Sequence, residues 1–116
     1  MIHRDFRPGN VIVYNDKLQG VIDWASGRAS FAEEDFCPLE LGEWSMHADR
    51  KKSFLSGYAT VRLVPDYSAI MPLLQLNRVL ATIGFTVKRG TWDNRHARLY
   101  QSNRLFLEIF FRGNGL

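Results

Sequence analysis

The sequence predicts an α+β fold that is mostly helical, with one small β-hairpin near the N-terminus. Two observations support this prediction. A short run of β-branched and aromatic residues lies on each side of a polar turn early in the chain, and apolar residues recur at helical spacing through the second half. The composition agrees, because 46% of the 116 residues are apolar and 13% are aromatic. We expect a single domain over residues 1–116.

The hairpin comes first in chain order. Val11–Tyr14 are β-branched or aromatic, as strand residues tend to be. Asn15 and Asp16 supply turn chemistry, and residues 18–22 form the returning strand. The small residues within 24–31 indicate a loop.

Two helical segments follow the loop. Residues 35–44 have the composition of a short helix or turn, and we expect it to be broken at Pro38 and Gly42. The next helix is predicted to begin at an N-cap, either Asp49 or Ser53. Its apolar positions are Phe54, Leu55, Tyr58 and Val61, and it should end before Pro65.

The C-terminal part of the sequence is predicted to form two longer helices. Asp66 is the expected N-cap of the first, which carries Pro72 in its opening turn and Gly84 near its end. Asp93 is the expected N-cap of the second, which should end at Gly113. Its inward residues are predicted to be Leu99, Tyr100, Phe106, Leu107, Phe110 and Phe111.

Several features limit the class of protein. Cys37 is the one cysteine, so an internal disulfide is excluded and a reducing compartment fits best. No apolar run is long enough to span a bilayer. Basic residues of the last two helices alternate with apolar ones, as on a solvated helix face, which argues against a nucleic-acid partner. We expect a cytoplasmic protein with no membrane association.

Acidic residues gather in one segment of a chain whose net charge is +3. Between residues 30 and 48 there is no Lys or Arg, and a cationic substrate would be attracted by the local field. A solvated face is an equally good interpretation. The four glutamates of this acidic segment, which we take as candidate substrate contacts, are Glu33, Glu34, Glu40 and Glu43.

The chemistry-bearing residues lie in and after the stretch His3-Arg4-Asp5-Phe6-Arg7-Pro8-Gly9-Asn10. Asp5 precedes Asn10 by five positions, and Asp23 follows Asn10 by thirteen, at the end of the hairpin. One carboxylate can accept the proton of a hydroxyl, while an amide and a second carboxylate supply the hard oxygen ligands that Mg²⁺ prefers. Arg7 can meet the charge of a transferred phosphoryl group. His3 is better suited to holding the loop backbone than to acting as a base.

Singly, Asp and Asn residues at turns usually satisfy backbone N–H groups. Together, the pattern His-x-Asp-x-x-x-x-Asn followed by a hairpin and Val21-Ile22-Asp23-Trp24 resembles the catalytic core of the aminoglycoside phosphotransferase family. That family belongs to the protein-kinase-like superfamily, which also holds choline kinases. Its motif commonly reads His-Gly-Asp-x-x-x-x-Asn, followed by a strand ending in Ile-Asp-Trp.

The resemblance covers residues 1 to about 41 and implies a fold, an activity and a set of roles. The fold would be a kinase-like C-terminal lobe with the site on its hairpin. Asp5 would be the catalytic base, assisted by Arg7, and Asn10 and Asp23 would bind Mg²⁺ and through it ATP. Asp35 would brace the loop that His3 also supports. The expected reaction is phosphorylation of a hydroxyl on a small, cationic molecule.

Two departures from related patterns keep alternatives open. His3-Arg4-Asp5 also resembles the protein kinase loop, but Trp24-Ala25 follows Asp23 where a protein kinase has Phe-Gly. This favours the small-molecule branch over a protein-kinase-like enzyme. The sequence also contains no Gly-rich phosphate loop and no strand lysine paired with a helix glutamate. We therefore expect a C-terminal fragment that needs a partner chain or a missing N-terminal lobe to bind ATP well. The remaining alternative is a non-catalytic remnant or binding module.

Overall fold

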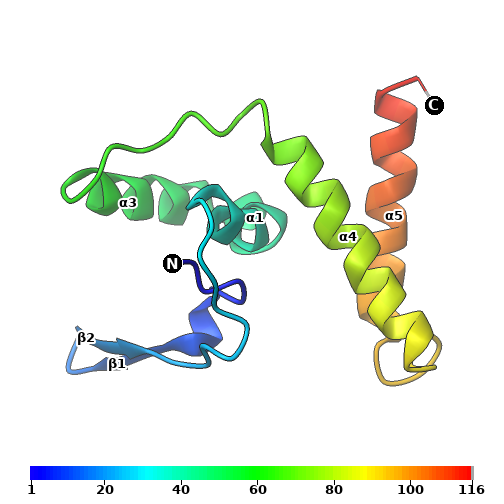
Figure 1. Ribbon diagram of the computed structural model, residues 1–116, viewed down its shortest axis with the longest axis horizontal. Coiled ribbons are helices and arrows are strands. Elements are labelled where there is room, and N and C mark those ends of the chain that lie inside the picture. The colour runs from blue at the N-terminus through cyan, green and yellow to red at the C-terminus, as the bar shows by residue number, and fades with distance from the viewer. Residues whose placement is uncertain (116) are drawn as a thin grey trace. The chain divides into compact units, whose positions relative to one another are not determined.

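The structure is a computed structural model that describes residues 1–115. The chain divides into two compact units, Met1–Met71 and Pro72–Leu116 (Figure 1). The first unit contains the only β-sheet of the described residues, a two-stranded hairpin, and the described chain is mostly helical. The predicted α+β class is therefore confirmed, while the prediction of a single domain stays a prediction. No helix of the described residues is both long and apolar enough to cross a membrane.

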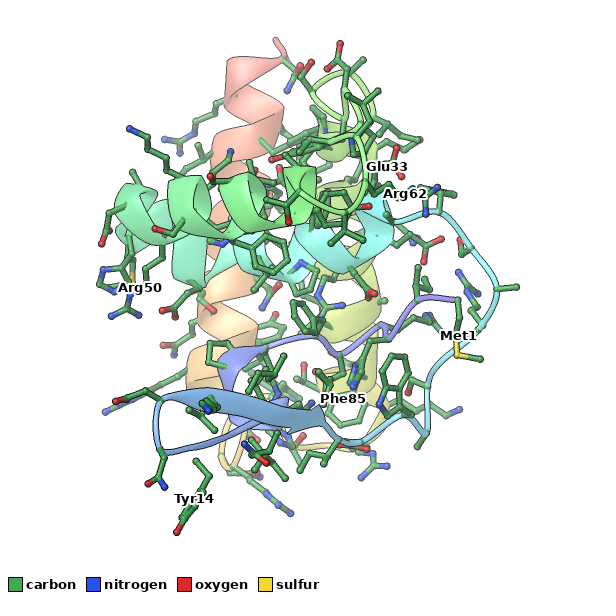
Figure 2. The ribbon with its side chains drawn as sticks, turned by 90° about the vertical axis from the view of Figure 1, so that its left-hand side faces the viewer. Met1, Tyr14, Glu33, Arg50, Arg62 and Phe85 are labelled. Carbon is green, nitrogen blue, oxygen red and sulfur yellow. The ribbon has the colours of Figure 1, made fainter. Side chains whose placement is uncertain are left out.

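The hairpin forms where the sequence predicts it. Strand β1 is Val11–Tyr14 and strand β2 is Lys17–Val21, one residue earlier than expected. Asn15 and Asp16 both have positive φ, 48° and 58°, which a tight hairpin turn requires and which these residue types tolerate. Tyr14 points away from the chain at this end of the hairpin (Figure 2).

Helix α1, Glu33–Leu41, runs through Pro38 without a break, so the predicted interruption at that residue is wrong. Phe36, Cys37 and Leu39 are buried on this helix, and their packing outweighs the missing N–H of the proline. Gly42 does end the helix, as predicted, and the short helix α2, Glu43–Met46, follows it.

Helix α3, Ala48–Ala59, starts earlier than the sequence suggests. His47 stands at the N-cap position, so neither Asp49 nor Ser53 caps the helix, and both predictions are wrong. The helix begins early because α2 leads almost directly into α3, which leaves no room for a separate cap. The helix ends before Pro65 as predicted, but Val61 lies beyond it and is 90% exposed.

An aromatic cluster forms the core of the first unit. The ring of Phe36 lies 5.3 to 6.1 Å from the rings of four residues, which come from α2, α3 and the segment after α3. These residues are Trp44, Phe54, Tyr58 and Tyr67. Phe6, in the loop before the hairpin, lies 5.9 Å from Phe54. The N-terminal loop is therefore tied directly to the helical core.

Asp66 is not the N-cap of the next helix. Its carboxylate accepts hydrogen bonds from the backbone N–H and the hydroxyl of Ser68, which makes a local turn. Helix α4, Met71–Lys88, begins a few residues later. Pro72 lies in its first turn as predicted, whereas Gly84 lies inside the helix.

The second unit consists of most of α4 and of α5, Ala97–Gly113, which run in opposite directions (Figure 1). His96, rather than Asp93, occupies the N-cap position of α5, because residues 91–96 form a turn closed by the hydrogen bond between His96 Nδ1 and Thr91 Oγ1. Leu99 and Phe111 are 41% and 38% exposed, so the prediction that they face inward is wrong. A unit of two helices buries only a narrow stripe of each. The other four residues expected to face inward, Tyr100, Phe106, Leu107 and Phe110, are partly buried.

Lys51 joins α3 to α1 and to the segment after α3. Its Nζ donates to Glu40 Oε1 at 2.5 Å, and the hydroxyl of Tyr67 donates to the same oxygen at 2.8 Å. The hydrogen bond and charge of Glu40 raise the pKa of Lys51 against the opposing effect of burial. Burial, with Glu40 adding to it, also raises the pKa of Tyr67.

We expect Lys51→Met to lower the free energy of unfolding by about 1 kcal/mol, in the upper range for a partly exposed ion pair. Lys52→Met, at the exposed neighbouring position, should change it by less than about 0.5 kcal/mol. Because the folded state raises the pKa of Lys51, its contribution is complete below the ordinary value of 10.5 and is lost as the pH rises through the raised value. Urea unfolding of the three proteins at neutral and at strongly alkaline pH tests this. If Lys51→Met still lowered the free energy of unfolding in strong alkali, the assigned ion pair would be contradicted.

Candidate active site

The buried side chain of His3 links the N-terminal loop to the hairpin. This side chain is 1% exposed, and its ring nitrogens have different partners. Nδ1 accepts a hydrogen bond from the backbone N–H of Asp5 at 3.2 Å, so the ring proton is on Nε2, which donates to the carbonyl of Ile22 at 2.7 Å. The ring also packs 4.6 Å from that of Trp24. A single imidazole thus fixes the distance between Asp5 and the end of the hairpin.

Asp35, in the first turn of α1, holds the loop from its other side. Its carboxylate oxygens accept hydrogen bonds from the backbone N–H groups of His3 and Arg4, each at 2.7 Å. Arg4 has a φ of 71°, in the left-handed region that L-residues rarely adopt. Two charge-assisted hydrogen bonds next to this residue compensate for the strain.

Asn10 is brought to Asp5 by a short 3₁₀ turn, Pro8–Asn10, in which the proline takes the first position. The Asn10 side chain is 4% exposed. Its Nδ2 donates to the backbone carbonyl of Asp5 at 2.8 Å and to Asp5 Oδ2 at 3.1 Å. Because both hydrogen bonds use the nitrogen, the amide oxygen Oδ1 is available as a ligand.

Asp23 lies at the end of the hairpin that the loop contacts. The preceding residue, Ile22, donates its backbone N–H to the carbonyl of Asn10 at 2.9 Å. The following residue, Trp24, donates its indole N–H to the carbonyl of Val21 at 2.7 Å. Between these two anchored neighbours Asp23 has a φ of 65°, which turns its exposed side chain out of the strand direction.

Arg7 lies beside the proposed base. Its Nε is 3.4 Å from Asp5 Oδ1, and the two side chains are 57% and 38% exposed. Such an exposed pair contributes little to stability. The guanidinium is therefore free to exchange this carboxylate for a phosphate oxygen at little cost.

The donor chemistry of the site fits a magnesium ion. Asn10 Oδ1 and the Asp23 carboxylate are hard oxygen donors, and Mg²⁺ is commonly held by few protein ligands together with water and phosphate oxygens. Within residues 1–115 no group of three or more His, Cys, Asp or Glu side chains is placed to hold a metal ion. The assignment of Asn10 and Asp23 to the metal stays a prediction.

The acidic segment carries less unpaired charge than its sequence indicates. Glu34 accepts hydrogen bonds from Ser30 Oγ at 2.6 Å and from Arg28 at 3.1 Å. Burial raises the pKa of Glu34, but these hydrogen bonds and the nearby arginine outweigh burial and lower it. Its contribution to stability is present above the ordinary carboxylate pKa and is lost as the pH falls through the lowered value.

Two further glutamates of this segment are also paired with cations. Glu40 binds Lys51, and Glu43 forms an ion pair with Arg50 on α3. Only Glu33 lacks an ion pair of this kind among the four. Attraction of a cationic substrate by the segment stays a prediction, and the salt dependence of substrate affinity tests it.

A buried histidine and a buried asparagine tie the loop that carries Asp5 to the hairpin. The family model described as the phosphotransferase enzyme family, APH, matches residues 1–73. This chain belongs to that family. No curated protein and no solved structure matches the chain.

The family match ends close to the boundary of the first compact unit, at Met71. It extends well beyond residue 41, where the resemblance in sequence motifs stops. The added part contains Lys51 and the rings that pack around Phe36. Lys51 contacts Glu40, 11 positions before it, and Phe54 contacts Phe36, which lies in another helix. Sequence reasoning missed these because no local pattern marks them. It also missed Trp24 as the ring that packs on His3, although the Ile-Asp-Trp motif named the residue.

Proposed function

We propose that this protein transfers the γ-phosphoryl group of ATP to a hydroxyl group of a small molecule. One observation carries the proposal: Asn10 binds Asp5 through its side chain and Ile22 through its backbone. The proposed base, one proposed metal ligand and the residue before the other ligand therefore form one hydrogen-bonded unit. The match to the phosphotransferase family supports the same reaction type.

In this reaction Asp5 accepts the proton of the acceptor hydroxyl as the hydroxyl oxygen forms a bond to the γ-phosphorus. The bond between the γ-phosphorus and the bridging oxygen breaks, and ADP leaves with the electron pair. Arg7 binds an oxygen of the phosphoryl group in transit. Asn10 and Asp23 would hold Mg²⁺, which would supply positive charge to the phosphates of the nucleotide. Asn10 also orients Asp5 through its Nδ2.

The role of Asp23 is tested by Asp23→Asn, which keeps the size of the side chain and its tolerance of positive φ. We expect the affinity for Mg·ATP to fall at least about tenfold, since an ionised ligand is replaced by a neutral one. Asp16→Asn is the matched control, because Asp16 is exposed, belongs to the same hairpin and also has positive φ. Isothermal titration calorimetry should show no change for the control. Equal affinity of the Asp23→Asn and unchanged proteins would remove Asp23 from the metal site.

The same titration separates the proposal from its alternatives. A non-catalytic remnant would bind no Mg·ATP at any accessible concentration, even in the complete phosphotransferase assembly. A protein-kinase-like enzyme would phosphorylate a serine-containing peptide in preference to small alcohols. We propose further that the nucleotide is bound jointly by this site and by an N-terminal lobe, which belongs either to this protein or to a partner chain. We also propose that the protein acts in the cytoplasm, where ATP is available.

A further inference from the structure

An apolar pocket lies next to the candidate active site. Its volume is about 340 Å³, within the range of small-molecule sites. All its lining residues belong to the first compact unit and come from the loop, β1 and helices α1 to α3. The apolar side chains that define it are Phe6, Val11, Val13, Leu39, Trp44 and Phe54.

The charged residues of the pocket are paired. Arg50, on the face of α3 that Figure 2 shows, forms an ion pair with Glu43. Arg7 is paired with Asp5. Each of these arginines already has a carboxylate partner, so the pocket carries no excess of either charge that would attract an ionic ligand. An ionic ligand would have to give up hydration without gaining a partner, whereas an uncharged apolar ring loses nothing on entering.

Two of the residues that line the pocket, Phe6 and Arg7, are neighbours of the proposed base. Phe6 follows Asp5 directly in the chain and lines the pocket. Arg7 lines it as well, and its Nε is 3.4 Å from Asp5 Oδ1. A ligand in the pocket can therefore extend a short polar group past Arg7 towards the carboxylate of Asp5.

We propose that this pocket binds the uncharged, apolar ring of an alcohol whose hydroxyl group Asp5 deprotonates. The inference rests on the proposed function and names the class of acceptor for the same site. It assigns Trp44 and Phe54 to substrate binding as well as to the core. It also differs from the cationic acceptor that the acidic segment predicts.

Phenethyl alcohol is a suitable probe, and its binding is measured by saturation-transfer NMR without nucleotide. Val13 lines the pocket and is 60% exposed, so Val13→Glu places a carboxylate there with little risk to the fold. We expect affinity to fall at least about tenfold, because the ring would displace water from a charge. Ile12→Glu is the matched control, since side chains alternate along β1 and Ile12, 45% exposed, does not line the pocket. Its affinity should stay within about twofold of the unchanged chain.

The inference would be overturned by no binding of phenethyl alcohol, by equal binding to the Val13→Glu variant, or by preferred binding of the cationic counterpart phenethylamine. A second copy of the chain in the pocket would give a dimer in light scattering that Val13→Glu dissociates, and this too would overturn it. Failure of this inference can be distinguished from failure of the proposed function. Binding that survives while no phosphoryl transfer occurs contradicts the proposed function alone. Transfer to polar alcohols without phenethyl alcohol binding contradicts this inference alone.

Discussion

Asp5→Asn is expected to lower the rate of phosphoryl transfer by about 10²- to 10⁴-fold, the usual loss when a general base is removed. The substituted amide can still accept the hydrogen bond from Asn10 Nδ2, which now meets Asp5 Oδ2 at 3.1 Å. The second bond from Asn10 goes to the backbone carbonyl and is unaffected. The variant should therefore fold normally and bind Mg·ATP with near-normal affinity. The acceptance of a proton is lost, together with the exposed ion pair to Arg7, which contributes little to stability.

The measurement is the initial rate of ADP formation with a saturating acceptor, in the complete phosphotransferase assembly. Asp16→Asn makes the same chemical change in the hairpin turn and serves as the control. Thermal unfolding of both variants checks that the fold is kept. A rate for Asp5→Asn within about threefold of the unchanged protein would show that Asp5 is not the base, because such a loss is far smaller than general-base catalysis supplies.

Asp35→Ala is expected to lower the free energy of unfolding by about 3 kcal/mol, the largest stability effect predicted for this chain. The carboxylate accepts two hydrogen bonds from the backbone of residues 3 and 4, and each hydrogen bond to a charged group is worth about 1.5 to 3 kcal/mol. Without it, the N–H of the buried His3 has lost its partner. The left-handed conformation of Arg4 also loses its support.

Glu33→Ala is the matched control, because Glu33 lies in the same first turn of α1 and shares the favourable interaction with the helix N-terminus. Glu33→Ala should lower the free energy of unfolding by less than about 1 kcal/mol. Urea unfolding measures both variants. Equal costs would mean that Asp35 acts only through the helix dipole and does not brace the loop.

The parts that the sequence predicted well depend on neighbours in the chain. Asn15 and Asp16 form the turn because their side chains tolerate positive φ, whatever surrounds them. Asp5 and Asn10 meet because a five-residue interval with Pro8 in its turn leaves little conformational choice. The same holds for the end of α1 at Gly42.

The wrong predictions concern positions where distant residues decide. Pro38 is tolerated in α1 because the aromatic core packs around the helix. Asp49, Asp66 and Asp93 do not cap helices, although each has a suitable side chain. His47 already stands at the N-cap of α3, Asp66 accepts hydrogen bonds from Ser68, and His96 stands at the N-cap of α5. The pairing of Glu40 with Lys51 was equally out of reach, since charge spacing in sequence does not reveal partners across two helices.

The buried imidazole between the Asp5 amide and the Ile22 carbonyl has a mechanical consequence. Any tilt of the hairpin is transmitted through this rigid five-membered ring, so Asp5, the proposed base, and Ile22, the residue before the proposed cation ligand, move together. The spacing between them is then preserved while the surrounding protein fluctuates. A side chain that takes no part in the proposed bond making would thereby set how accurately the proposed base and the proposed metal ligand stay aligned.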